Sequence, residues 1–364
     1  MLRRTIIPSL LQRRILHTRL PDLTCLRALL AGWVFSYHLY LQMGVPAGGW
    51  AAVAFHRGYL GVDGFFVLSG FVLAYGDPPR AVAAIPGFWA RRLLRIYPIH
   101  LATILLLALL LGAAALAGLA PRDPARFDAA ALWQHLLLLH GWGWADSWAW
   151  NYPSWSISSE WAGYLAFPLL LAVMLRLPAS TAGLVVALGV AALAWLERSS
   201  PTGLNLSLQG PLWRFLPEFV AGIALCRAVR GSALPQRAGM LACAAVAVPV
   251  AVVWLPDTGV VAALALLILA LAGAGLAGGR VLDRIPGLRV LGGLSYAFYM
   301  SFAVSEMLLA AALRAAGRRP PDQPLLYIAA MTAVTLVLAL ALSFGVERPA
   351  LRLLRPRARL TAPA

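Results

Sequence analysis

The sequence predicts an all-α protein, a polytopic transmembrane bundle of about ten helices with both termini in the cytoplasm. Composition is the first reason, because 61% of the 364 residues are hydrophobic, only 12% are charged and the mean hydropathy is +0.78. The second reason is that apolar runs of about 17 to 24 residues recur, and helices of that length can cross a hydrocarbon core. The third is that basic residues fall between these runs.

The ten runs alternate with short polar or basic connections. The predicted spans are 26–43, 58–75, 97–119, 154–175, 181–196, 213–229, 238–255, 259–277, 290–313 and 325–346. All 30 basic residues are arginine, and placing both termini in the cytoplasm puts 22 of them on the inner side. The positive-inside rule favours this orientation. Arg314, Arg318 and Arg319 fall on the outer side and count against it.

The chain divides into three parts. Residues 1–21 form a basic arm that we expect to face lipid headgroups from the cytoplasm, with an organellar transit peptide as the alternative. Residues 22–349 form the transmembrane domain, and residues 350–364 form a basic cytoplasmic tail. The expected location is a bacterial inner membrane, in contact with its lipids.

Several function classes receive no support. A net charge of +16 would suggest nucleic acid in a soluble protein, but here the arginines set orientation or contact anionic groups, so no nucleic-acid partner is expected. Cys25, Cys226 and Cys243 lie in or beside apolar stretches without metal-ligand spacing, so neither a disulfide framework nor a metal site is predicted. No GxSxG, HExxH or Walker pattern occurs.

Ionisable residues inside apolar segments are the first functional candidates, because charge there is costly and usually faces a cavity or partner. Arg27 and His38 are eleven residues apart, close to three helical turns and about 16 Å of rise, so they share one face. His38 and Asp63 come from consecutive antiparallel spans and lie about equally far from the outer boundary. We therefore predict that His38 is a general base oriented by Asp63.

Three glutamates fall near the same predicted depth. Glu160 is assigned to the catalytic group with His38 and Asp63, whereas Glu218 and Glu306 are predicted to make structural hydrogen bonds between helices. Ser69 is either a polar site residue or bonded to its own helix. The glycines of LGVDGFFVLSGF indicate close helix packing rather than a phosphate loop.

A basic cluster marks the inner mouth. Arg91, Arg92 and Arg95 lie in the second connection, near Arg27, and guanidinium groups bind phosphate through paired hydrogen bonds. Ordinary positive-inside charge is the alternative. An anionic site with a base about 16 Å deeper would suit an extended, phosphate-headed donor with a reactive tail.

The longest outer connection, about 120–153, is rich in tryptophan. It is predicted to be an aromatic belt or an interfacial helix, or alternatively a platform for a sugar or lipid acceptor, since flat aromatic faces pack against sugar rings.

Seven motifs then occur in one order over about residues 22–349. They are Arg27 with ten residues before His38, GVDGFFVLSGF, FWARRLLRIYP, PSWSISSEWAGYLAFP, PEFVAG, LGGLSYAFYM and GVERP. Together they resemble the acyltransferase 3 family, integral membrane enzymes that move acyl groups, commonly acetyl, from cytoplasmic coenzyme A thioesters to sugars of surface polysaccharides, glycolipids or related acceptors.

The resemblance implies an acyltransferase, transferring groups other than aminoacyl groups, that acts on a hydroxyl of a sugar, polysaccharide precursor or glycolipid. It implies acyl-CoA, expected to be acetyl-CoA, as donor substrate, with no tightly bound cofactor. The implied site residues are His38 as base, Asp63 and Glu160 at the family's acidic positions, and Arg27, Arg91, Arg92 and Arg95 for the donor.

Phe302 stands where many members of the family have a histidine, so that histidine's role is absent or supplied elsewhere. Two other functions therefore stay open. A transporter or flippase for lipid-linked glycans would move its substrate without releasing coenzyme A, and a scaffold or sensor would bind without turnover. The sequence also leaves open whether the acceptor is a macrolide-like small molecule or a polysaccharide precursor.

Overall fold

Every regular element in the described part of the chain is a helix, which confirms the all-α class. The structure is a computed structural model that describes residues 20–353 apart from 45–47, 77, 80, 122, 146, 232–236 and 319–321. The predicted arm 1–21 and tail 350–364 lie largely outside the described residues, so their assignments stay predictions.

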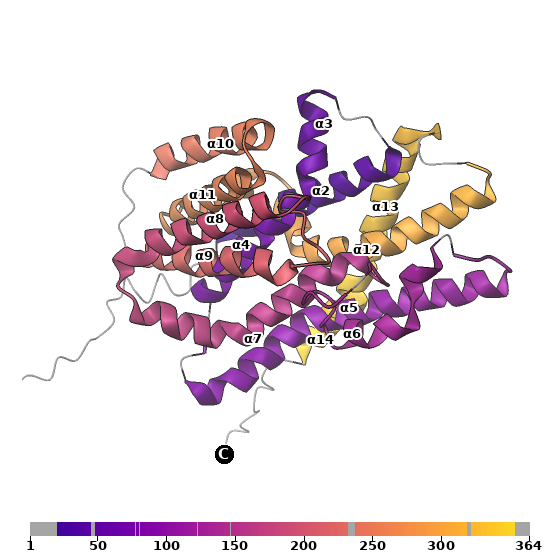
Figure 1. The fold of residues 1–364 in the computed structure, drawn as a ribbon, viewed down its shortest axis with the longest axis horizontal. Helices are drawn as coiled ribbons and strands as arrows, with labels where there is room; N and C mark the ends of the chain where they lie inside the picture. The colour runs from indigo at the N-terminus through magenta and orange to yellow at the C-terminus, as the bar shows by residue number, and fades with distance from the viewer. Residues whose placement is uncertain are drawn as a thin grey trace, which may run out of the picture.

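Each predicted span overlaps one long helix of the bundle (Figure 1). The α-helices are α2 (Pro21–Met43), α3 (Gly49–His56), α4 (Gly61–Tyr75), α5 (Ile85–Leu116), α6 (Leu132–Leu136), α7 (Trp155–Arg176), α8 (Ala182–Ser199), α9 (Pro211–Gly231), α10 (Arg237–Trp254), α11 (Asp257–Leu276), α12 (Leu288–Ala315), α13 (Pro324–Leu342) and α14 (Arg348–Arg352). A π-helical turn, Ser343–Glu347, joins α13 to α14.

Seven of the described helical segments are long and apolar enough to cross a membrane, judged by length and composition. They are Gly49–Tyr75, Val82–Leu116, Tyr152–Arg176, Ala179–Ser199, Asp257–Leu276, Leu288–Ala315 and Pro324–Arg352. Helices α2, α9 and α10 are not among them. The first two carry polar or charged side chains within the bundle, and the apolar part of α10, Met240–Trp254, is shorter. The number of crossings and the side on which the termini lie stay predictions.

Helix α5 begins well before the predicted boundary at residue 97. Its first turn contains Pro86, which fits there because the first turn needs no backbone N–H donor, and Pro98 lies inside the helix without ending it. The predicted basic connection is therefore the first part of a helix. This places Arg91, Arg92 and Arg95 on a rigid element rather than on a loop.

Helix α4 lies in the interior of the bundle. It packs mainly against α9, while α2 packs against α12, so the early and late parts of the chain lie side by side (Figure 1). The most apolar stretch of Gly49–Tyr75 is 78% buried, whereas that of Ala179–Ser199, which contains α8, is only 11% buried. The bundle thus surrounds α4 and leaves α8 on the periphery.

Glycines allow α4 and α9 to approach closely. A Cβ added at Gly70 would lie 2.0 Å from the backbone oxygen of Phe219, and one at Gly222 would lie 2.0 Å from that of Val67. A backbone oxygen cannot move aside as a flexible side chain can. The α4–α9 contact therefore depends on both glycines.

Replacing Gly70 with alanine should lower the free energy of unfolding by about 1–3 kcal/mol, because the two helices must separate to admit the methyl group. Thermal unfolding in detergent measures this. Gly112→Ala on α5 is the matched control, since its Cβ would meet no atom within 4 Å. Equal melting temperatures for the two variants would contradict the close packing.

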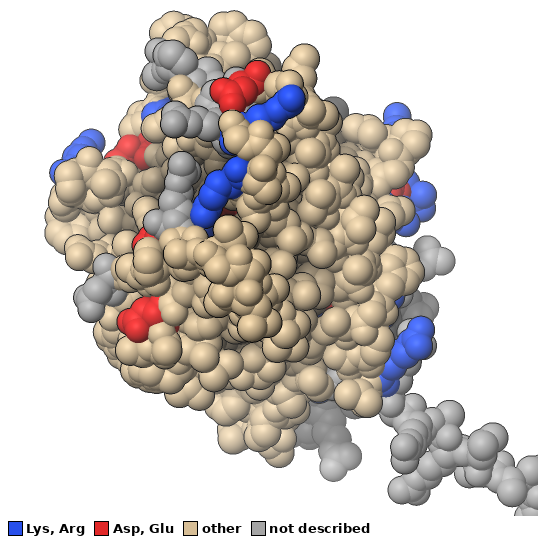
Figure 2. Space-filling model, turned by 90° about the vertical axis from the view of Figure 1, so that its right-hand side faces the viewer, with Lys and Arg blue, Asp and Glu red and all other residues tan. Residues whose placement is uncertain are grey.

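Most of the described surface on the face at the right of Figure 1 is uncharged (Figure 2). Basic and acidic side chains appear there in small, separate groups, so no broad basic surface covers the described part of that face. Apolar side chains such as Leu105 and Leu109 on α5 and Leu184 and Leu188 on α8 are more than half exposed. Such exposure is typical of helices that face lipid.

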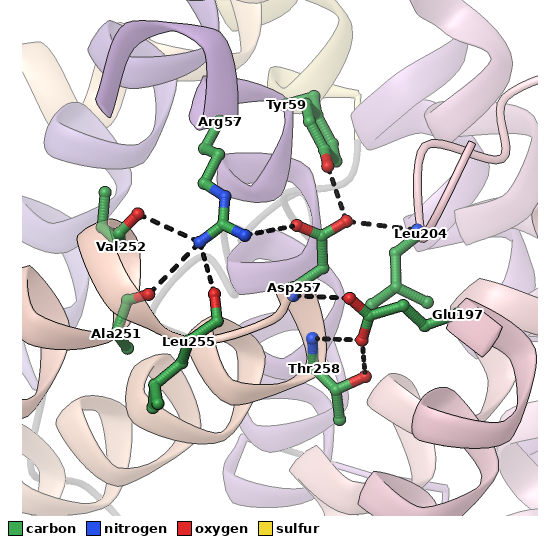
Figure 3. Close-up of polar contacts among 9 residues, drawn as sticks. All are labelled: Arg57, Tyr59, Glu197, Leu204, Ala251, Val252, Leu255, Asp257 and Thr258. Carbon is green, nitrogen blue, oxygen red and sulfur yellow. Dashed lines mark hydrogen bonds and ion pairs between the residues drawn. The ribbon is translucent and has the colours of Figure 1, made fainter. Parts of the chain in front are cut away.

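A polar cluster links the turn between α10 and α11 to Arg57, which stands just before the predicted span 58–75 (Figure 3). Arg57 donates to the carbonyl oxygens of Ala251 and Val252 and lies 3.6 Å from Asp257. Glu197 accepts hydrogen bonds from the N–H groups of Asp257, at 2.8 Å, and Thr258, at 3.0 Å. These two bonds satisfy the free donors at the start of α11, so the cluster is structural.

Candidate active site

A cavity lies between helices from both halves of the chain, and it contains about 900 Å³ of empty space, part of it open to solvent. Most of the lining is apolar, with a few convergent polar groups. Four of the predicted site residues line it, namely Arg27, Arg92, Arg95 and Glu160.

The three arginines come from different helices, Arg27 from α2 and Arg92 and Arg95 from α5. Arg95 forms an ion pair with Glu347 of the π-helical turn, and Ser343 donates to the same carboxylate at 3.1 Å. Glu347, the glutamate of the GVERP motif, therefore positions Arg95 in the cavity lining.

Arg91 does not share this position. Its side chain is exposed and does not line the cavity, although it is adjacent to Arg92 in sequence. Successive residues on a helix point in different directions, which the prediction of a basic connection did not take into account.

Glu160 faces the same cavity as the arginines. Its Oε1 atom accepts hydrogen bonds from the Ser69 hydroxyl at 2.6 Å and from the Tyr164 hydroxyl at 2.7 Å. Ser69 therefore bonds across to α7, which makes it a polar residue of the site. The hydrogen-bond partners of Glu160 in the described structure are these two hydroxyls, which also line the cavity, and its catalytic role stays a prediction.

The predicted pairing of Asp63 with His38 is wrong. Asp63 instead pairs with Arg214 of α9, whose Nε atom donates to Oδ1 at 2.7 Å and whose Nη2 atom contacts Oδ2. Both side chains are fully buried. A guanidinium satisfies both carboxylate oxygens at once, which a single imidazole N–H cannot do, and a buried carboxylate requires such compensation.

Sequence reasoning missed Arg214, and the available signal was its position four residues before Glu218 in an apolar span. Glu218 is fully buried on the same helix and interacts with the Asp63 carboxylate. The Arg214 guanidinium also lies over the rings of Tyr59 and Trp155, at 5.7 and 5.4 Å from their centroids.

His38 occupies a separate site next to the cavity. Its Nδ1 atom lies 3.4 Å from the Tyr152 hydroxyl, which donates to Glu306 at 3.2 Å. The ring of Phe302 lies 4.4 Å from that of His38 and 5.9 Å from that of Tyr299, a residue that lines the cavity. One aromatic side chain therefore separates the cavity lining from His38. Tyr152 was missed, and Glu306 was predicted to be only structural.

The outer connection contains a buried histidine cluster. The rings of His135 and His140 stack at 3.8 Å, and His100 of α5 stacks on His140 at 5.8 Å. Burial, with a smaller effect of nearby His100, lowers the pKa of His135 to about 3, so this ring is neutral near pH 7. Among the tryptophans of this connection, Trp133, Trp144 and Trp148 are more than half exposed, which leaves both predictions for the segment open.

A match to a protein-family model identifies the family of this chain. A family model described as an acyltransferase domain, Acyl_transf_3, matches residues 20–344, which include the cavity and His38. The chain belongs to the acyltransferase 3 family. This acyltransferase is also similar to "Acyltransferase MdmB" of Streptomyces mycarofaciens, with 32% identity over 380 aligned positions covering 95% of each chain. No solved structure matches the acyltransferase.

The family membership confirms the predicted resemblance and shows that the protein is an enzyme that transfers acyl groups. Its apolar helices fit an integral membrane protein. The roles predicted for the individual residues stay predictions.

Proposed function

We propose that this protein is a membrane-bound O-acyltransferase that moves an acyl group, acetyl in the first instance, from acyl-CoA to a hydroxyl of a sugar-containing acceptor. The observation that carries the proposal is the cavity, which has three arginines in its lining and comes within one aromatic side chain of His38.

Arg27, Arg92 and Arg95 suit the phosphate groups of coenzyme A, because guanidinium forms strong, directional hydrogen bonds with phosphate oxygens. The apolar lining, which includes Val62, Phe65 and other residues of α4, suits an extended thioester arm. Glu347 holds Arg95 and so restricts where that charge can act.

His38 acts as the general base in this proposal. It removes the proton of the acceptor hydroxyl as the oxygen attacks the thioester carbonyl, and a C–O bond forms. The C–S bond then breaks, and the imidazolium returns the proton to the leaving thiolate. An acyl-enzyme on His38 or a serine is the alternative route.

The acceptor is assigned to the side of His38, where the partly exposed Glu306 and Arg126 lie. A sugar hydroxyl fits this polar edge, and the exposed tryptophans nearby in sequence could pack against sugar rings. Both a polysaccharide precursor and a macrolide-like molecule satisfy this chemistry. The proposed location is the inner membrane of a bacterium.

The test is acyl transfer by purified protein in nanodiscs, with acetyl-CoA and a crude cell-envelope glycan extract. We expect free thiol to appear together with an acceptor that has gained one acetyl group by mass spectrometry. Movement of a lipid-linked glycan across proteoliposomes, with no thiol release from any common acyl-CoA, would instead favour the transporter.

Neighbouring arginines on α5 provide a matched pair for the donor site. Arg92→Gln should weaken acetyl-CoA binding about 10- to 100-fold, because it removes a charge-assisted hydrogen bond from the cavity. Arg91→Gln should change the dissociation constant by less than about two-fold, since this side chain is exposed outside the cavity. Titration calorimetry in detergent compares them, and equal losses would indicate only a general effect of positive charge.

A further inference from the structure

A chain of polar contacts leads from His38 to Tyr152, Glu306 and Arg126. The Tyr152 hydroxyl lies between Nδ1 of His38, at 3.4 Å, and Oε2 of Glu306, at 3.2 Å. Arg126 lies 3.8 Å from the same Glu306 oxygen, and its guanidinium carbon is 4.9 Å from the centre of the Tyr152 ring. The group joins α2, the outer connection, the turn before α7, and α12.

The backbone beside Tyr152 is firmly held. Asn151 is fully buried and donates to the Thr103 hydroxyl at 2.8 Å and to the Met300 carbonyl at 3.1 Å. Ser154, also fully buried, donates to the Asn151 carbonyl at 2.7 Å. The tyrosine hydroxyl therefore has a fixed place between the histidine and the carboxylate.

The direction of each hydrogen bond follows from counting protons. A carboxylate oxygen without a proton can only accept, and Oε2 of Glu306 lies 3.2 Å from the Tyr152 hydroxyl. The single hydroxyl proton of Tyr152 then points to Glu306. The tyrosine oxygen can therefore only accept from His38, so Nδ1 carries a proton and Nε2 is left with a free lone pair.

We infer that Tyr152 and Glu306 are positioning residues that hold His38 in the tautomer with a basic Nε2 and stabilise the imidazolium formed during transfer. This role was predicted for Asp63, whose carboxylate is bound to Arg214 instead. The inference rests on the proposed function of His38 as the base. Among the described residues, Tyr37 is also titratable and in ring contact with His38. Its hydroxyl accepts a hydrogen bond from Asn205 at 3.3 Å.

Nitrogen NMR of the ¹⁵N-histidine-labelled full chain in nanodiscs tests the tautomer without any substrate. The His38 signals are assigned by their absence in His38→Ala. We expect a protonated Nδ1 and an unprotonated Nε2 in the wild type, and a mixture of tautomers in Tyr152→Phe. Tyr37→Phe is the matched control, because it removes a neighbouring hydroxyl that does not bond to His38. A wild-type ring protonated on Nε2 would overturn the inference.

Thiol release from acetyl-CoA with the same glycan extract tests the consequence. Tyr152→Phe should lower kcat by about 10²-fold with KM changed less than two-fold, since Tyr152 acts on His38 and not on the binding of acetyl-CoA. Glu306→Gln keeps an acceptor oxygen but loses the charge, so its kcat should fall between the wild type and Tyr152→Phe.

The outcomes separate the two claims. Normal kcat in both Tyr152→Phe and Glu306→Gln, with an inactive His38→Ala, would overturn the positioning role of Tyr152 and Glu306 and keep His38 as the base. Full turnover by His38→Ala would overturn both. Melting temperatures close to that of the wild type show that the variants are folded.

Discussion

Replacing His38 with alanine should lower kcat for acyl transfer by at least about 10²-fold and leave the protein folded and inserted. In the proposed mechanism the imidazole takes a proton from the acceptor hydroxyl and returns it to the thiolate, and its ring contacts Phe302, which is in contact with the cavity lining. Thiol release from acetyl-CoA, measured at saturating donor, gives the change in kcat.

The control for this substitution is His56→Ala. His56 lies at the end of α3 with its side chain exposed, and it is separated from His38 by the ring of Tyr37. Donor affinity should be unchanged in both variants, since neither residue lines the cavity. Turnover that survives in His38→Ala would remove the base from the mechanism and favour direct attack assisted by another group.

Breaking the buried pair of Asp63 and Arg214 should have the largest effect on stability. Asp63→Leu removes the carboxylate that accepts two contacts from a buried guanidinium, and the loss of one partner from such a pair costs about 3–5 kcal/mol. Thermal unfolding in detergent should show a large fall in melting temperature. The double variant Asp63→Leu with Arg214→Met should recover most of it, because two apolar side chains of similar volume need no compensation.

The same substitutions separate a structural from a catalytic role for Asp63. If Asp63 acted on His38, a loss of kcat without a loss of stability would be expected, and the double variant would remain inactive. Our account expects the reverse, with turnover returning as stability returns, since Arg214 and not His38 holds the carboxylate.

The sequence was sufficient for the class of fold and the approximate position of the ten long helices, because about 20 apolar residues in a row have few alternatives in a membrane. The predicted boundary at residue 97 was wrong, because α5 begins at Ile85. The arginines before residue 97 were interpreted as a connection, yet no helix-breaking residue separates Arg91 from Arg95, and the helix continues through them.

The basic cluster was predictable in part. Arg27, Arg92 and Arg95 meet at one cavity, as residue type and helix order suggested, whereas Arg91 lies outside it and Glu160 joins the arginines there. The surroundings of His38 were not predictable, because depth in the membrane fixes only one coordinate. Which carboxylate lies near the histidine also depends on how each helix is rotated and packed. In the structure Asp63 pairs with Arg214, and Tyr152 connects Glu306 to His38.

The most direct measurement is an experimental structure of the acyltransferase with coenzyme A bound, obtained by electron microscopy in nanodiscs. Our account predicts the phosphates within hydrogen-bond distance of Arg27, Arg92 and Arg95, and the thiol end in the part of the cavity bordered by Tyr299, next to Phe302 and His38. Coenzyme A bound outside this cavity, with the arginines free of phosphate, would contradict it.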